Sequence, residues 1–121
     1  AALTCTVSSL RYKRNVQPLS QATAKSIVGR LRPVTFEYRS GGRSAFGLIA
    51  ESVDSVDKRL VSYDAQKRPN AVNYEQLAVL LLSEVQRLRK SVDSLTTIVR
   101  TTQMPCVGPN CILVSIASPP R

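Results

Sequence analysis

A hydroxyl and an amine that could act together lie near the amino terminus of the chain. The stretch SSLRYKRNV, residues 8–16, begins with Ser8 and carries Lys13 five residues later. A serine hydroxyl becomes a nucleophile when a base takes its proton, and a neutral lysine can be that base. Arg11 and Arg14 flank Lys13, and nearby positive charge favours the neutral form of an amine. The residue types fit a Ser–Lys pair, and they equally fit a solvated basic strand in which the serines are inert.

The backbone between these residues decides which hydroxyl can reach the amine. In a straight strand successive side chains point to opposite faces, so Ser9 shares a face with Lys13 and Ser8 points away. Ser8 can meet Lys13 only through a turn or a bulge, or across an interface between chains. Both serines are therefore candidates at this point, with Ser9 as the substitute.

The composition excludes several other kinds of active site. The chain has 121 residues and no histidine, so serine–histidine and cysteine–histidine pairs cannot form within it. Three cysteines cannot make a four-thiolate zinc site, and we expect no cofactor and no metal. Cys106 and Cys111 bracket the turn sequence VGPN and could close a small disulfide loop that leaves Cys5 over. Three free thiols are an equal alternative.

The net charge of +9 raises the question of acidic partners. Eight basic residues and one acidic residue lie within residues 10–43, which would suit phosphate binding. Aromatic residues make up only 5% of the chain and tryptophan is absent, so base-stacking surfaces are scarce. A solvated basic face is the simpler interpretation, and a nucleic-acid-binding module is the weakest of the functions considered. No secretory signal appears, and the apolar tail ILVSIA is too short to cross a bilayer.

Short runs of differing periodicity predict one α+β domain. Apolar residues spaced by three and four follow Ser20, a capping residue, and Pro33 must end that helix. Alternating residues predict strands that join in one small antiparallel β-sheet. The expected elements are a helix over 20–31, strands over 34–39 and 45–50 around a turn at 40–42, a helix over 51–60, and strands over 60–64 and 71–74.

A long heptad pattern is the strongest signal for association. Its apolar positions alternate in spacing between four and three: Leu81, Val85, Leu88, Val92, Leu95 and Val99. A helix of roughly 28 residues would be about 42 Å long, which is more than a small sheet can cover, so we expect self-association rather than packing on its own domain. Valine at a and leucine at d favour a parallel dimer. Leu82 and Ile98 widen the apolar face and suit a third helix.

Several runs in this order resemble a known family. They are SS-x-RYK-x-NV, LRPVTFEY, GLIAESV and VNYEQLAVLLLSEVQRL, and the resemblance covers nearly all of residues 8–100. Together they resemble the C-terminal intramolecular chaperone domain of phage tailspikes and tail fibres, best known from endosialidase tailspikes, to which a domain of the myelin regulatory factor is related. The resemblance implies a homotrimer that assists folding of a β-rich fibre segment upstream in the same polypeptide. Many such domains then cut themselves off.

The resemblance also implies roles for individual residues. The family cuts before a serine and uses a lysine five residues later, which assigns Ser8 as nucleophile, Lys13 as base and Val7–Ser8 as the cleaved bond. The family motif commonly continues with aspartate, and Ser9 stands in its place here. A non-cleaving trimerisation and attachment cap is therefore the alternative. In GLIAE we expect Gly47 to permit close backbone approach and Leu48 and Ile49 to fill the core.

These expectations combine into one organisation. The fold class is α+β, with a small antiparallel β-sheet, short helices and a long C-terminal helix that forms a homotrimeric coiled coil. Because the chain opens on Ala1 rather than methionine, we expect further sequence upstream. The resemblance implies a phage tail-fibre or virion precursor folded in the host cytoplasm, and a cellular homologue is compatible with it. The expected parts are an upstream segment over 1–7, a chaperone core over 8–74, an oligomerisation helix over 75–103 and a tail over 104–121.

Overall fold

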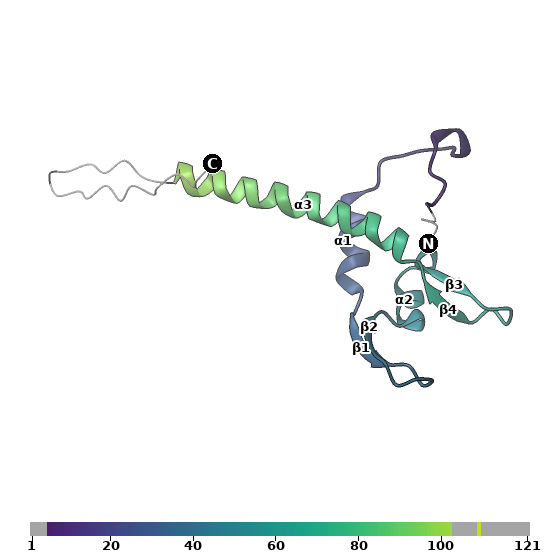
Figure 1. Cartoon of the computed structure of the whole chain (residues 1–121). Helices are drawn as coiled ribbons and strands as arrows, with labels where there is room; N and C mark the ends of the chain where they lie inside the picture. Colours follow the sequence, from purple (N-terminus) through teal and green to yellow (C-terminus); the bar gives the residue numbers. More distant parts are fainter. Residues whose placement is uncertain (1–4, 103–108, 110–121) are drawn as a thin grey trace. The chain divides into compact units, whose positions relative to one another are not determined.

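The α+β class and the long C-terminal helix are confirmed by the computed structural model, which describes residues 5–102 and Pro109 (Figure 1). The chain divides into two compact units, Ala1–Arg87 and Leu88–Arg121. The elements in order are the 3-10 turn η1 (Leu10–Tyr12), α1 (Gln21–Arg30), β1 (Val34–Glu37), β2 (Ser44–Gly47), α2 (Ala50–Val56), the 3-10 turn η2 (Lys58–Leu60), β3 (Val61–Tyr63), β4 (Pro69–Val72) and α3 (Tyr74–Thr101). Apart from Pro109, the tail expected over 104–121 lies outside the described residues, and so do Cys106 and Cys111.

Local signals account for α1 and the first hairpin. Ser20 caps α1, and its hydroxyl accepts a hydrogen bond from the Thr23 amide. The helix ends before Pro33, because the residue before a proline avoids helical backbone angles. β1 and β2 then pair antiparallel. Gly41 and Gly42, with φ of 94° and 56°, make the left-handed turn between them.

The apolar run after this turn forms less strand than predicted. A strand over 45–50 is wrong at its end, since β2 stops at Gly47 and α2 begins at Ala50. The short helix expected over 51–60 is confirmed in its first part, but it ends earlier than predicted, since α2 covers Ala50–Val56. Asp57 takes an extended conformation with φ of −158°, and its carboxylate accepts a hydrogen bond from the Arg59 amide, which starts η2 as a separate turn.

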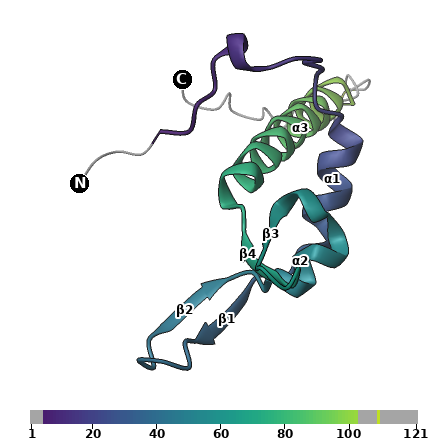
Figure 2. The same ribbon diagram turned by 90° about the vertical axis from the view of Figure 1, so that its right-hand side faces the viewer.

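The second hairpin is separate from the first. The predicted single sheet is wrong, because β3 pairs only with β4 and β1 only with β2 among the described strands, as Figure 2 shows. The strand predicted over 71–74 is present but lies two residues earlier, since β4 covers Pro69–Val72. Asn73 caps the next helix by accepting a hydrogen bond from the Gln76 amide at 3.1 Å, so Tyr74 belongs to α3.

A small aliphatic core holds the first unit together. Its members are almost fully buried and come from α1 and the residue that caps its end, α2, η2, β3 and the first turns of α3: Ala24, Ile27, Leu31, Val53, Leu60, Val61, Leu77 and Leu80. Each fully buried aliphatic side chain stabilises the fold by roughly 1.5–3 kcal/mol. The core therefore fixes the beginning of α3 against the segments that precede it.

The seam residues of α3 have a different environment from its first turns. α3 has 28 residues. The six seam positions are 44–62% exposed in the single chain: Leu81, Val85, Leu88, Val92, Leu95 and Val99. No helix in the described part of the chain is both long enough and apolar enough to cross a bilayer.

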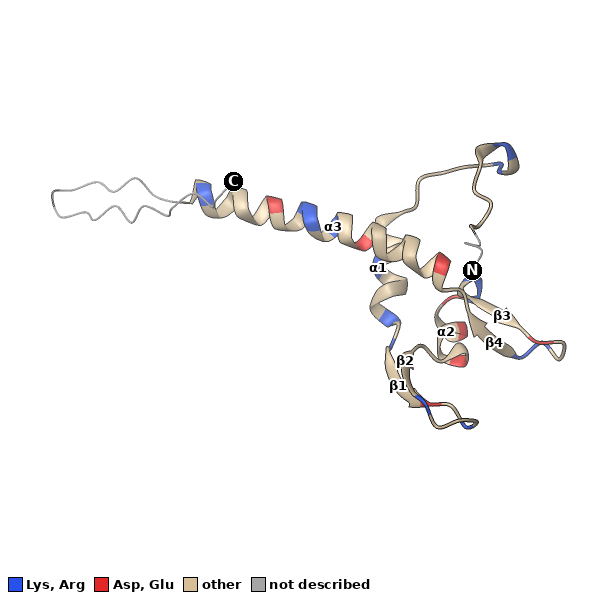
Figure 3. Cartoon of the chain, viewed as in Figure 1, with Lys and Arg blue, Asp and Glu red and all other residues tan. Residues whose placement is uncertain are grey.

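The positive charge is distributed over several elements. Figure 3 marks the basic residues in blue along η1, α1, the hairpin loops and α3. The eight basic residues within 10–43 thus lie in or just after η1, in or just after α1, and in the loop between β1 and β2, rather than on one element.

Candidate functional site

A tight turn brings the predicted pair of side chains together. In η1 the Tyr12 amide donates to the Ser9 carbonyl at 3.1 Å, and the Lys13 amide donates to the Leu10 carbonyl at 3.0 Å. The turn folds the chain back, so that Lys13 returns toward the residue just before the turn. In a straight strand Ser8 and Lys13 would point to opposite faces, and this turn is the departure from a straight strand that lets them meet.

Ser8 is the serine that meets the amine. Lys13 Nζ donates a hydrogen bond to Ser8 Oγ at 2.7 Å. Ser9 stands at the start of the turn, and its side chain makes no capping hydrogen bond. The structure thus brings together two of the three residues that the sequence singled out and leaves Ser9 aside.

The surroundings of the pair are basic and open to solvent. Both side chains are exposed in the single chain. The Arg11 guanidinium lies over the Tyr12 ring, 4.9 Å from its centre, so a second cation is fixed within the same turn. The arrangement provides a nucleophile and an amine at hydrogen-bonding distance, but in the single chain both groups are exposed to solvent.

The segment before Ser8 has a partner that sequence reasoning missed. Thr6 Oγ1 donates a hydrogen bond to Glu75 Oε2 at 2.5 Å. Glu75 is the second residue of α3 and lies 69 residues from Thr6 in the sequence. No local spacing could have indicated this contact.

The GLIAE run meets the start of α3 through its glycine. A Cβ atom added to Gly47 would lie 2.8 Å from the Tyr74 hydroxyl, which confirms the expected close approach. That hydroxyl accepts a hydrogen bond from the Leu48 amide at 3.0 Å. Leu48 packs against the core, but the same expectation for Ile49 is wrong, since it is 41% exposed at the start of α2.

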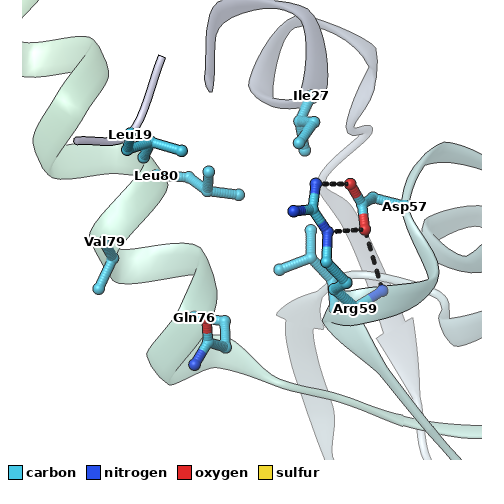
Figure 4. Close-up of a pocket in the computed structure, with 8 residues that line it drawn as sticks. Leu19, Ile27, Asp57, Arg59, Gln76, Val79 and Leu80 are labelled. Atoms are coloured by element: carbon cyan, nitrogen blue, oxygen red, sulfur yellow. Dashed lines mark hydrogen bonds and ion pairs between the residues drawn. The ribbon is translucent and has the colours of Figure 1, made fainter. Parts of the chain in front are cut away.

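A hollow of about 170 Å³ next to α1 and α3 is structural (Figure 4). Leu19, Ile27 and Leu80 form part of its apolar wall. At its edge Arg59 donates two side-chain hydrogen bonds to Asp57, at 2.6 and 3.0 Å. These bonds lower the pKa of Asp57 from 3.8 to about 2. Since the two charges satisfy each other and no hydroxyl, thiol or amine lines the hollow, it offers no nucleophile.

Comparison with known proteins agrees with the sequence motifs. Within the described residues no group of three histidine, cysteine, aspartate or glutamate side chains could hold a metal ion. No curated protein matches the chain. Residues 8–62, from Ser8 through Lys13 and the GLIAE run to β3, match the model of the family described as the chaperone of endosialidase.

Proposed function

We propose that the chain is an intramolecular chaperone domain that trimerises, assists folding of an upstream fibre segment and then cleaves its own backbone between Val7 and Ser8. The observation that carries the proposal is the hydrogen bond of 2.7 Å between Lys13 Nζ and Ser8 Oγ. It lies at the residue where the match to the chaperone family begins. The family match supports the chaperone role, and the geometry supports the self-cleavage.

The proposed reaction needs only groups of this chain and one water molecule. Neutral Lys13 accepts the Ser8 hydroxyl proton while Ser8 Oγ attacks the Val7 carbonyl carbon. A bond forms between that carbon and Oγ, the bond from the carbon to the Ser8 nitrogen breaks, and the nitrogen receives the proton. Water then hydrolyses the resulting ester, which releases the Val7 carboxylate and restores the Ser8 hydroxyl. Because the substrate is the chain's own backbone, each chain reacts once.

Association of chains would supply the burial that favours a neutral Lys13 amine, which the exposed turn of the single chain lacks. In the single chain Lys13 donates to Ser8 Oγ, whereas the reaction requires the proton to move from Ser8 to Lys13. Burial disfavours the charged form of an amine. A neighbouring subunit that covers the exposed turn would therefore favour the neutral amine, and cleavage would follow assembly.

α3 presents one face to its own domain and another for association. Leu77, Leu80 and the Glu84–Arg87 ion pair lie on the first face, with Leu77 and Leu80 buried in the core. The exposed seam through Leu88 lies on a second face, roughly 80° away around the helix. A helix can therefore pack on its domain and on neighbouring helices at the same time.

Further exposed apolar surface adjoins the seam. Leu81 also lines an apolar hollow of about 280 Å³ together with Leu31, Leu48 and Phe46. Phe46 is 87% exposed in the single chain. Apolar surface of this kind on one side of a domain is typical of a protein–protein interface. With the wide face made by Leu82 and Ile98, it favours a trimer over a dimer.

Trimerisation explains how such a domain assists a fibre. Joining three chains at one end raises the effective concentration of the upstream segments from bulk dilution toward the millimolar range. Slow pairing between distant β-strands then begins with the three chains in register. Cleavage afterwards makes the assembly irreversible. A phage tail fibre or tailspike is the client that the family suggests.

Intact-mass spectrometry on a chain extended upstream tests the proposal. The parent should yield a fragment that starts at Ser8, whereas Ser8→Ala and Lys13→Ala should remain whole. Ser9→Ala is the matched control, because it removes the adjacent hydroxyl, which makes no capping hydrogen bond, and it should cleave like the parent. The cleaved fraction should also rise with protein concentration if assembly precedes cleavage.

Three results would contradict parts of the proposal. Identical intact masses for the parent and all variants would retire self-cleavage and leave the non-cleaving cap. Cleavage that Ser9→Ala abolishes and Ser8→Ala spares would show that the wrong serine was assigned. Light scattering on the same samples counts the subunits, and a monomer at high concentration would remove the trimer.

A further inference from the structure

The segment just before the proposed cleavage bond is tied to the first turn of α3. Thr6 donates its hydroxyl proton to the Glu75 carboxylate at 2.5 Å. Hydrogen bonds to a charged acceptor are shorter and stronger than those between neutral groups. Thr6 precedes Val7, whose carbonyl would be attacked, so the contact lies one residue from the reacting carbon.

A second contact holds the other side of the same peptide bond. Ser8 is paired with Lys13 at 2.7 Å. The Val7–Ser8 bond therefore lies between two side-chain contacts, one to α3 and one to the turn η1. Holding both flanks of a reacting bond restricts the geometries that it samples, and correct positioning is a large part of catalysis.

The acceptor is itself fixed by the packing of the domain. Glu75 follows Tyr74, whose hydroxyl accepts from the Leu48 amide at 3.0 Å and lies against Gly47. Asn73 caps the same turn. Glu75 thus occupies this position only when α3 has formed and packed against the first hairpin.

We propose, on the basis of the proposed self-cleavage, that Glu75 is a positioning residue for the reaction and that the hydroxyl at position 6 is a specificity determinant. The Glu75 carboxylate holds the segment before the cleaved bond through the Thr6 hydroxyl. Since Glu75 depends on the folded start of α3, this contact makes cleavage conditional on that helix being in place. Substrate segments with a hydroxyl residue at position 6 are preferred over those with an apolar one.

Single-turnover cleavage rates of the upstream-extended chain test this role. Glu75→Ala and Thr6→Val should each slow cleavage by roughly tenfold to a hundredfold, the range for a hydrogen bond to a charged group. The double variant should cleave no more slowly than either single variant, because the two substitutions remove the same contact. Thr6→Ser should cleave like the parent, since it keeps the hydroxyl. Asp93→Ala is the matched control that removes another exposed carboxylate from α3.

A merely structural role for Glu75 would give a different set of results. Loss of helix stability in Glu75→Ala would not depend on the residue at position 6, so the two effects would multiply in the double variant. Multiplying effects, or a Glu75→Ala rate equal to that of Asp93→Ala, would overturn the inference while the parent still cleaves. A parent that stays whole would overturn the proposed self-cleavage and this inference together.

Hydrogen exchange in a non-cleaving background tests the contact without the reaction. In Ser8→Ala protein, Glu75→Ala should increase the exchange rates of the amides of Val7 and residue 8. Thr6→Val should increase these rates by the same factor. Unchanged exchange in both would show that the contact does not restrain this segment, and the inference would fail.

Discussion

The apolar seam of α3 leads to a quantitative prediction about assembly. Val92 lies on the seam and is 59% exposed in the single chain, whereas Val79 is 56% exposed on the same helix. The two side chains point about 140° apart around the helix axis. Val92→Ala and Val79→Ala therefore make the same chemical change at the same exposure, and only the first removes surface from the seam.

The expected effect on the trimer follows from the area that association would cover. Val→Ala removes two carbons, worth about 1.6 kcal/mol when fully buried at about 0.8 kcal/mol per carbon. Since Val92 is 59% exposed before association, about 1 kcal/mol per chain is lost, or about 3 kcal/mol per trimer. This lowers the trimer association constant by about a hundredfold. The midpoint concentration rises by about tenfold, because formation of a trimer depends on the square of the monomer concentration.

Sedimentation equilibrium over a dilution series measures that midpoint. Val79→Ala should leave it unchanged, and any gain in helix propensity from alanine is shared by both variants. Equal shifts for the two variants, or no shift for Val92→Ala in a protein that still forms trimers, would refute the assignment of the seam.

Two predictions concern the stability of the domain. Gly47→Ala should lower the free energy of unfolding by about 1 kcal/mol, because the new methyl group displaces the Tyr74 hydroxyl from the Leu48 amide. The same change should cost little in a Tyr74→Phe background, and an equal cost in both backgrounds, measured by urea unfolding, would contradict the proposed clash. For Asp57, the hydrogen bonds from Arg59 lower the folded-state pKa from 3.8 to about 2. The carboxylate thus contributes stability above about pH 4 that is lost as the pH falls toward about 2. The melting temperature of the parent should fall over that window more steeply than that of Asp57→Asn, and parallel curves would contradict the assignment.

Long periodic patterns were predictable, and short apolar runs were not. The heptads of α3 predicted a long helix because many residues repeat the same spacing. The run AFGLIA reads equally well as a strand or as the start of a helix. α2 begins after Ile49, which offers no side-chain hydrogen bond as a cap, so no residue in the sequence marks that boundary. The strand predicted over 45–50 therefore includes Ala50, the first residue of α2.

The candidate site likewise has a part that was predictable from the sequence and a part that was not. The types and spacing of Ser8 and Lys13 pointed to the pair, but the turn between them contains Leu10, Arg11 and Tyr12 and lacks glycine, proline or asparagine. Its position was therefore not predictable from turn chemistry. The Thr6–Glu75 contact depends on how distant segments pack, and local patterns carry no information about it.

The hydrogen bond between Lys13 and Ser8 has a consequence for the products of the proposed cut. When the Val7–Ser8 peptide becomes a free amino group, that group takes up a proton and becomes a cation on the residue whose hydroxyl accepts from Lys13. The new ammonium group lies on the residue that Lys13 contacts, and it has no lone pair with which to attack the Val7 carboxylate. Religation becomes unfavourable, and the severed strand no longer has its covalent tether to hold Thr6 at α3. Protonation of the new amino group on Ser8 would thus help to make the cut irreversible, because only a neutral amine can attack the Val7 carboxylate.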